Sequence, residues 1–176
     1  MHDIRPFPTT IRVLSVAAGL TLAVASAPAH GAIITISDVV LDGSQVVPPV
    51  LDAGHGLASV TIDTDTRAVS ITGTYASMSS QVIAAHLHGP ADPGEDSPLI
   101  IFPLTHDAGL GGTFSGGRTL SLAQFDALMG SRTYINVHTA SHPAGEIRGQ
   151  IFVPSPAGSF AIAIAGLTAI RRRHRA

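Results

Sequence analysis

Apolar and polar residues alternate along much of the chain, in short segments that turn residues separate from one another. Alternation with a period of two places one set of side chains on each face of a β-strand. In residues 57–64, for example, Val60 and Ile62 alternate with Thr61 and Asp63. By this criterion the predicted strands are residues 33–41, 57–64, 68–75, 82–88, 98–104, 132–139 and 146–153.

Two segments depart from this pattern. The glycine-rich residues 109–117 predict only a poor strand around Phe114, because glycine weakens a strand interior. Residues 121–129 have a helical period, in which Ser121 can cap the first turn. The side of this helix expected to be apolar consists of Leu122, Phe125, Leu128 and Met129. Many short strands with one helix predict an all-β domain, an antiparallel sandwich or barrel.

A pair of histidines lies on one of the predicted strands. His86 and His88 are two residues apart in the strand 82–88, so their imidazoles share a face. The opposite, apolar face is expected to consist of Ile83, Ala85 and Leu87. The register of the strand therefore directs both imidazoles away from the core.

Two later strands carry further polar patches. Asn136 and His138 share one face of the strand 132–139, where Ile135 and Val137 form the other face. The last predicted strand places three polar residues on one face, namely Glu146, Arg148 and Gln150. Strands that pair would bring these patches close to the two histidines.

Two interpretations of these patches remain open. The imidazoles of His86, His88 and His138 would form a plausible ligand set for copper or zinc. Alternatively, the same side chains form a structural hydrogen-bond network that needs no ion, together with Asn136, Glu146 and Arg148. The network is preferred, because the Arg148 guanidinium would repel a nearby cation. Glu146 and Arg148 are then expected to form an ion pair on the strand surface.

The first 29 residues have the order of a signal peptide. Arg5 and Arg12 precede an apolar run over residues 13–27, and small residues at positions 27–29 fit a cleavage signal. We therefore predict a hydrophobic helix here, a signal peptide over residues 1–29, and removal by signal peptidase during export.

The C-terminal segment, residues 153–176, has three parts. A proline-containing motif precedes a 14-residue apolar run over residues 157–170, which is short for a transmembrane helix of roughly 20 residues. The motif residues are Val153, Pro154 and Pro156, and the terminal arginine cluster includes Arg171, Arg172 and Arg173. The segment resembles the PEP-CTERM sorting signal, although Ser155 replaces the usual Glu. The resemblance implies transient membrane insertion, an exosortase-type processing enzyme, and delivery to the outer surface or extracellular matrix. An ordinary tail anchor is the alternative.

Charge and composition exclude several classes of function. The chain has ten arginines, no lysine, twelve acidic residues and a net charge of −2. Eleven of the acidic residues but only four arginines lie in residues 30–153, which gives this region a charge of −7. An acidic domain is a poor ligand for a phosphate backbone, so nucleic acid is excluded as a partner. Cysteine is absent, and no G-x-S-x-G nucleophile motif occurs, so no catalytic residue is predicted.

Four segments resemble the CHRD domain, a family named after chordin and common in bacterial secreted proteins. They are LDGSQVVPPV (41–50), AAHLHGPADPG (84–94), SLAQFDALMG (121–130) and YINVHTASHPAGEIRGQI (134–151). Val46 stands where the family pattern has Glu, and His142 where Asn is typical. The resemblance implies an antiparallel β-sandwich over residues 33–153, immunoglobulin-like or Cu,Zn-superoxide-dismutase-like. It implies no agreed enzymatic activity.

The sequence therefore predicts an exported protein of the cell envelope or extracellular matrix. Its CHRD domain is expected to be a non-enzymatic binding or structural module without a cofactor, and its partner an extracellular polysaccharide or protein. One alternative is a copper- or zinc-binding protein, or a metal-dependent enzyme, that uses the histidine cluster. Another is a purely architectural role, with a stable domain displayed at the surface.

Overall fold

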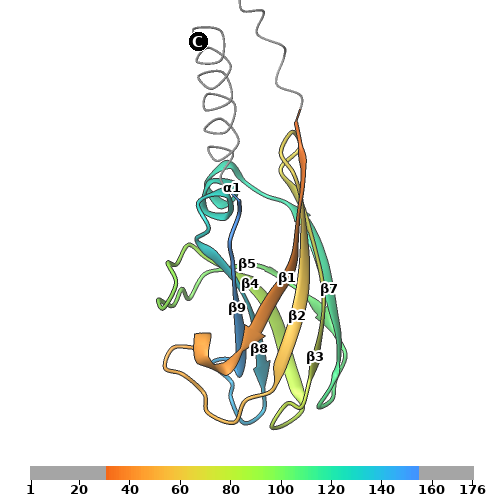
Figure 1. Cartoon of the computed structure of the whole chain (residues 1–176), viewed down its shortest axis with the longest axis vertical. Helices are drawn as coiled ribbons and strands as arrows, with labels where there is room; N and C mark the ends of the chain where they lie inside the picture. The colour runs from red at the N-terminus through yellow and green to blue at the C-terminus, as the bar shows by residue number, and fades with distance from the viewer. Residues whose placement is uncertain (1–30, 155–176) are drawn as a thin grey trace, which may run out of the picture.

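The computed structural model of the chain describes residues 31–154, and it joins nine strands in a single sheet (Figure 1). The strands are β1 (Ile33–Asp42), β2 (His55–Asp63), β3 (Ala68–Ala76), β4 (Val82–His88), β5 (Ile100–Pro103), β6 (Thr105–His106), β7 (Gly112–Thr119), β8 (Thr133–Thr139) and β9 (Ile147–Ile151). A 3-10 turn, η1 (Gly43–Gln45), follows β1, and the helix α1 (Leu122–Met129) precedes β8.

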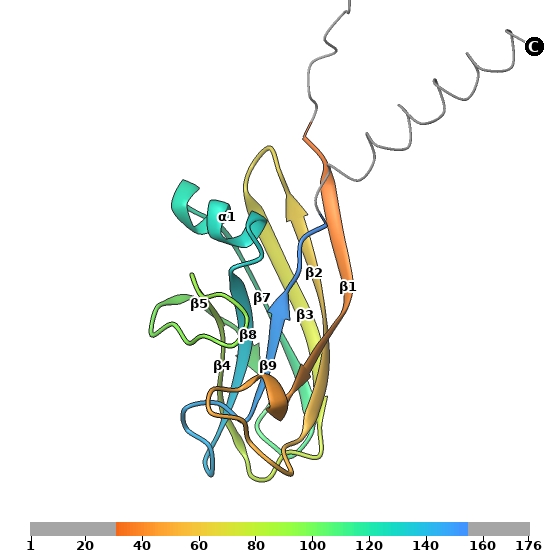
Figure 2. The ribbon, with the colours of Figure 1, turned by 60° about the vertical axis from the view of Figure 1, so that its left-hand side comes forward.

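The sheet is curled so that its two edges approach each other. The strand order is β5-β4-β8-β9-β1-β2-β3-β7-β6, and the paired neighbours are antiparallel. Across the gap, β4 contacts β6 and β5 contacts β7. The Leu104 N–H, between β5 and β6, donates a hydrogen bond of 2.8 Å to the Ala85 carbonyl of β4. The sheet is therefore nearly closed around its core (Figures 1 and 2).

The predicted antiparallel β domain with one short helix is confirmed, and most strands lie within two or three residues of their predicted bounds. The strand around Phe114 is longer than predicted, because β7 pairs with β3 without interruption from Gly112 to Thr119. The short β6 was not predicted at all. Pairing runs through all nine strands of one sheet, so the immunoglobulin-like or superoxide-dismutase-like sandwich stays a prediction.

The inner face of the curled sheet holds the hydrophobic core. Val60 of β2 and Ile71 of β3 face each other directly, and neither is exposed to solvent. Phe114 of β7 lies opposite Gly73 of β3, where a Cβ atom would collide with the phenyl ring. Glycine at this position therefore lets the ring lie flat across the neighbouring strand, and full burial of such a side chain contributes about 1.5–3 kcal/mol.

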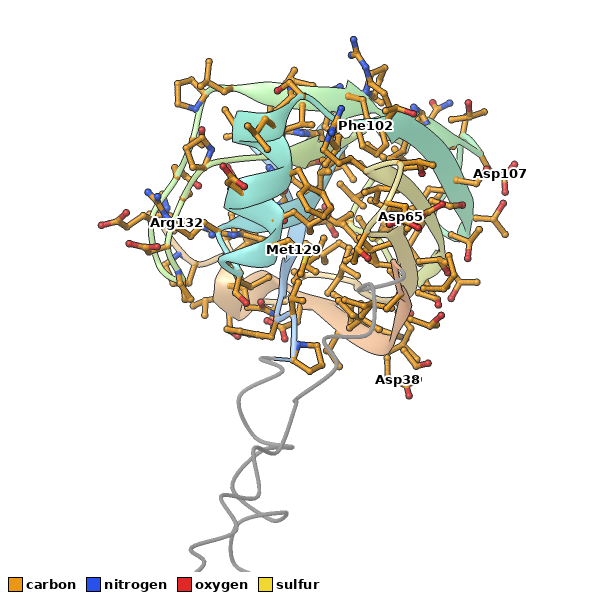
Figure 3. All side chains as sticks on the ribbon, turned by 90° about the horizontal axis from the view of Figure 1, so that it is seen from above. Asp38, Asp65, Phe102, Asp107, Met129 and Arg132 are labelled. Atoms are coloured by element: carbon orange, nitrogen blue, oxygen red, sulfur yellow. The ribbon has the colours of Figure 1, made fainter. Side chains whose placement is uncertain are left out.

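Helix α1 covers one end of the barrel, with Met129 pointing toward the interior (Figure 3). Its N-terminus is a capping box, in which Ser121 and Gln124 exchange side-chain to backbone hydrogen bonds, as the sequence predicted for Ser121. The predicted apolar side is wrong at Leu122, which is 65% exposed. Leu122 is the first residue of the helix and lies about 120° around its axis from the fully buried Leu128, and its side chain is left largely in solvent.

The described structure does not test the terminal segments predicted from the sequence. The signal peptide, the apolar run 157–170 and the arginine cluster lie outside the described residues. Within residues 31–154, no helix is both long and apolar enough to cross a membrane.

A buried carboxylate holds the opposite end of the barrel together. Glu146 is completely buried and accepts hydrogen bonds from the backbone N–H groups of Gly54 and Ser79, at 3.1 and 2.7 Å. The hydroxyls of Ser79 and Thr139 donate to its second oxygen. Burial by itself would raise the pKa of this carboxyl group, but the four hydrogen bonds outweigh burial and lower it. The ionised carboxylate of Glu146 therefore links three segments: the one before β2, the one before β4 and the end of β8.

We predict that Glu146→Gln destabilises the domain by about 3 kcal/mol, because the amide NH₂ would face donors while one acceptor is lost. Chemical denaturation measures the change. Glu95→Gln is the matched control, since Glu95 is exposed and should tolerate the change within about 0.5 kcal/mol. An equal, small effect of the two substitutions would contradict this role for Glu146.

Candidate functional site

The polar side chains of β4 and β8 meet on one face of the sheet, outside the barrel core. His86 pairs directly with Asn136, and His88 with Tyr134, so these side chains lie on the same face. His138 pairs with Ala84, two residues before His86. The pairing confirms the prediction that the histidines of both strands share a face directed away from the core.

The apolar face of β4 differs from the prediction at one residue. Ala85 and Leu87 are completely buried, as expected, but Ile83 is 52% exposed. The pairing of β4 with β8 is irregular between Val82 and Ala84, and this irregularity turns Val82 into the core in place of Ile83.

Strand β8 is buried on both faces, because two loops cover its polar face. The β4–β5 loop, residues 89–99, is held by the Tyr134 hydroxyl, which accepts from the Ser97 N–H and donates to the Ser97 carbonyl, both at 3.1 Å. This loop projects beside β4 in Figure 2. The β8–β9 turn, residues 140–146, is held by Asn136, whose amide donates to the Ala144 carbonyl over 3.1 Å.

The covering loops also fix two imidazole rings. His88 Nδ1 lies 3.1 Å from the Ser97 carbonyl, and His138 Nδ1 lies 3.0 Å from the Pro143 carbonyl. A carbonyl oxygen can only accept, so each Nδ1 carries the proton and, in the neutral ring, the lone pair is on Nε2.

The two Nε2 atoms have different surroundings. His138 Nε2 lies 3.2 Å from His86 Nδ1, which donates to it. His88 Nε2 is buried without any hydrogen-bond partner among the described residues. One ring nitrogen from each of the three histidines lies within 4.8 Å of the others. The structure therefore brings together the three imidazoles that the sequence singled out.

The pKa values of all three imidazoles are lowered. Burial is the main cause for His88, whose pKa falls to about 4, although its hydrogen bond to the Ser97 carbonyl opposes the shift. Burial also lowers the pKa of His138, and burial together with the neighbouring His138 and His106 lowers that of His86. The cluster is consequently neutral at pH 7.

Arg148 lies behind Tyr134, outside the histidine cluster. Its guanidinium carbon lies 3.7 Å from the centre of the Tyr134 ring, whose other neighbour is the His88 ring, stacked at 5.2 Å between centroids. The guanidinium pairs with Asp96 at 3.5 Å and donates to Gln150 at 2.8 Å. Tyr134 therefore separates the positive charge from the imidazoles.

The predicted ion pair between Glu146 and Arg148 is wrong. Arg148 pairs with Asp96 instead, while the Glu146 carboxylate turns toward Ser79 at the end of the barrel. The reason is the turn before β9: Gly145 has a φ of +132°, so the strand alternation does not extend back to Glu146. Asn136, Glu146 and Arg148 each have polar contacts, but these contacts form separate groups instead of a single network with the histidines.

Sequence reasoning missed the groups that orient the histidines. Tyr134 was recognisable in principle, because it lies two residues before Asn136 and therefore on the same face of β8. The carbonyls of Ser97 and Pro143 leave no signature in the sequence, since every residue has a carbonyl group.

One comparison with known proteins identifies a family. A family model described as the CHRD domain matches residues 37–151, which include most of β1, all of β2 to β9 and the histidine cluster. No curated protein and no solved structure matches the chain.

The lowered pKa of His88 predicts that the domain is sensitive to acid. Unfolding restores the ordinary pKa of 6.5, so the unfolded chain binds more protons than the folded domain between pH 6.5 and about 4. In chelator-treated protein, the free energy of unfolding should therefore decrease as the pH falls through this window, by at most about 1.4 kcal/mol per pH unit for each such group.

Urea denaturation at a series of pH values measures this dependence. His88→Asn, which removes the titrating ring, should make the decrease shallower. Stability that stays constant or rises as the pH falls from 6.5 toward 4 would contradict the assignment of a neutral, buried His88.

Proposed function

This chain belongs to the CHRD domain family, and we propose that it is an exported, non-enzymatic binding module of the cell envelope or extracellular matrix. Two features of the sequence support export: the signal peptide predicted over residues 1–29 and the sorting segment 153–176. Signal peptidase and an exosortase-type enzyme are the processing partners of this proposal. The family supports an extracellular binding or structural role for residues 37–151.

The observation that favours binding is a pair of hollows on either side of one loop, residues 46–51. One hollow has a volume of about 440 Å³ and extends toward Arg148, Gln150 and Phe152. The other has a volume of about 410 Å³ and lies between this loop and residues 141–145. Both are lined by Val46, Val47 and Pro49, so the loop forms a ridge between them.

The lining of this surface favours a polypeptide as the partner. Valine and proline are its most frequent residues, and Leu51 and Phe152, which also line it, are 85% and 60% exposed. Exposed apolar side chains beside concave surfaces are typical of protein–protein contacts. The exposed acidic residues Asp38 and Asp107 lie elsewhere at the periphery of the barrel and point outward (Figure 3), which favours a partner that is not itself acidic.

We predict that Leu51→Ser weakens capture of the partner about tenfold or more, because it removes an exposed apolar anchor from the ridge loop. The experiment is a pull-down from the extracellular-matrix fraction with the form that cells export, whose ends are located by mass spectrometry. Leu122→Ser is the matched control, since Leu122 is also highly exposed but lies on α1, at the other end of the barrel.

A polypeptide retained by the unsubstituted protein and by Leu122→Ser, but lost with Leu51→Ser, is the expected result. Equal retention by both variants would contradict the assignment of this surface. If the protein binds on a glycan array and captures no polypeptide, the partner is a polysaccharide and not a protein. If neither assay detects a ligand, binding is refuted and the domain is architectural.

A further inference from the structure

We propose that His86, His88 and His138 form a binding site for one divalent transition-metal ion, zinc or copper, on the covered outer face of β4 and β8. This site goes beyond the proposed binding function. It does not include the ridge loop, so the two sites are tested by separate experiments.

The spacing of the three ring nitrogens fits a metal ion. Because the three atoms lie within 4.8 Å of one another, they all lie within about 2.8 Å of a common point, close to the 2.0–2.1 Å of a zinc–imidazole bond. His86 Nδ1 and His138 Nε2 are already 3.2 Å apart, and two ligands of a tetrahedral zinc ion are separated by about 3.3 Å. Shifts of less than about 1 Å in each ring would complete the coordination.

The unpartnered nitrogen of His88 is the second, independent observation. His88 is only 7% exposed, and its Nε2 has no hydrogen-bond partner within the described domain. Buried polar atoms are nearly always paired, and of the four unpartnered ones in the described residues only His88 Nε2 is an imidazole lone pair beside two other imidazoles, where it is free to bind an ion.

The hydrogen bonds that orient two of the rings are also those that metal-binding histidines make. A ligating imidazole usually donates its other N–H to a carbonyl or carboxylate, which fixes the tautomer and the ring plane. His88 and His138 donate in this way to the Ser97 and Pro143 carbonyls. In the metal-free protein His86 Nδ1–H donates to His138 Nε2; on metal binding this bond is lost, and the His86 proton moves to its own Nε2.

The donor set selects the class of metal. Three imidazoles suit zinc and copper, whereas calcium and magnesium require oxygen ligands, and the cluster contains no carboxylate. His86 is only partly buried, which leaves an approach from solvent and a fourth position for water.

Arg148 opposes a cation in the cluster less than the sequence suggested, although its charge is one of the causes that lower the pKa of His88. The Tyr134 ring lies between the guanidinium and His88, and the positive charge is partly balanced by Asp96. The repulsion expected from Arg148 is therefore reduced by distance and by its own ion pair.

The test is metal titration of the full chain, purified without an affinity tag and freed of metal by a chelator that is then removed. Zn²⁺ and Cu²⁺ are added separately at neutral pH, and binding is followed by calorimetry and elemental analysis. We expect one equivalent of at least one of these ions to bind and to raise the midpoint of thermal unfolding. Mg²⁺ and Ca²⁺ should not bind in its place.

Two substitutions locate the site. His88→Asn and His86→Asn should each weaken binding by more than about 100-fold, since loss of a second-shell partner alone costs about 10- to 100-fold. Because His86 is partly exposed, its substitution should leave the core folded, and a loss of metal binding in this variant then reports on the site itself. His106→Asn is the control: His106 is the neighbouring imidazole outside the cluster, and its substitution should leave the affinity unchanged.

Uptake of less than about one tenth of an equivalent of both ions would overturn the proposal. So would binding that survives in His86→Asn and His88→Asn, or that is lost in His106→Asn, because the ion would then be held by exposed imidazoles elsewhere. Leu51→Ser should bind the metal like the unsubstituted chain, which separates this result from the fate of the proposed partner surface.

Discussion

Burial of both faces of β8 is the constraint on which the arrangement of the site depends. One face, with Ile135 and Val137, belongs to the hydrophobic core, while the other carries Tyr134, Asn136 and His138. Polar groups removed from water need hydrogen-bond partners, and neighbouring strands cannot supply enough of them. Two loops supply their backbone carbonyls instead, and in doing so they hold the imidazoles of His88 and His138 in one tautomer.

The same layer of side chains connects the two surfaces for which functions are proposed. Arg148 and Gln150 of β9 line the hollow beside the ridge loop, and Arg148 stacks on Tyr134, which stacks on His88. Gln45, immediately before the ridge loop, accepts a hydrogen bond of 3.0 Å from the Gln150 N–H. The ridge loop and the histidine cluster therefore both contact the same layer of side chains.

Period-two alternation was sufficient to predict the strands and to place the histidines on a common face. It failed where the strands are irregular: at Ile83 because the pairing with β8 shifts, and at Glu146 because the turn at Gly145 precedes β9. It also could not show that the polar face is covered, because burial under a loop depends on the path of residues 89–99 and not on any local pattern. The family resemblance identified the CHRD domain, which the family match confirms.

The central claim is that the covering loops hold His88 and His138 as neutral rings with the proton on Nδ1 and the lone pair on Nε2. The most direct measurement is the long-range ¹H–¹⁵N correlation spectrum of the imidazole nitrogens in chelator-treated protein at pH 7. We predict that both rings are neutral and protonated at Nδ1. A proton on Nε2 of either ring, or an imidazolium at this pH, would contradict the account.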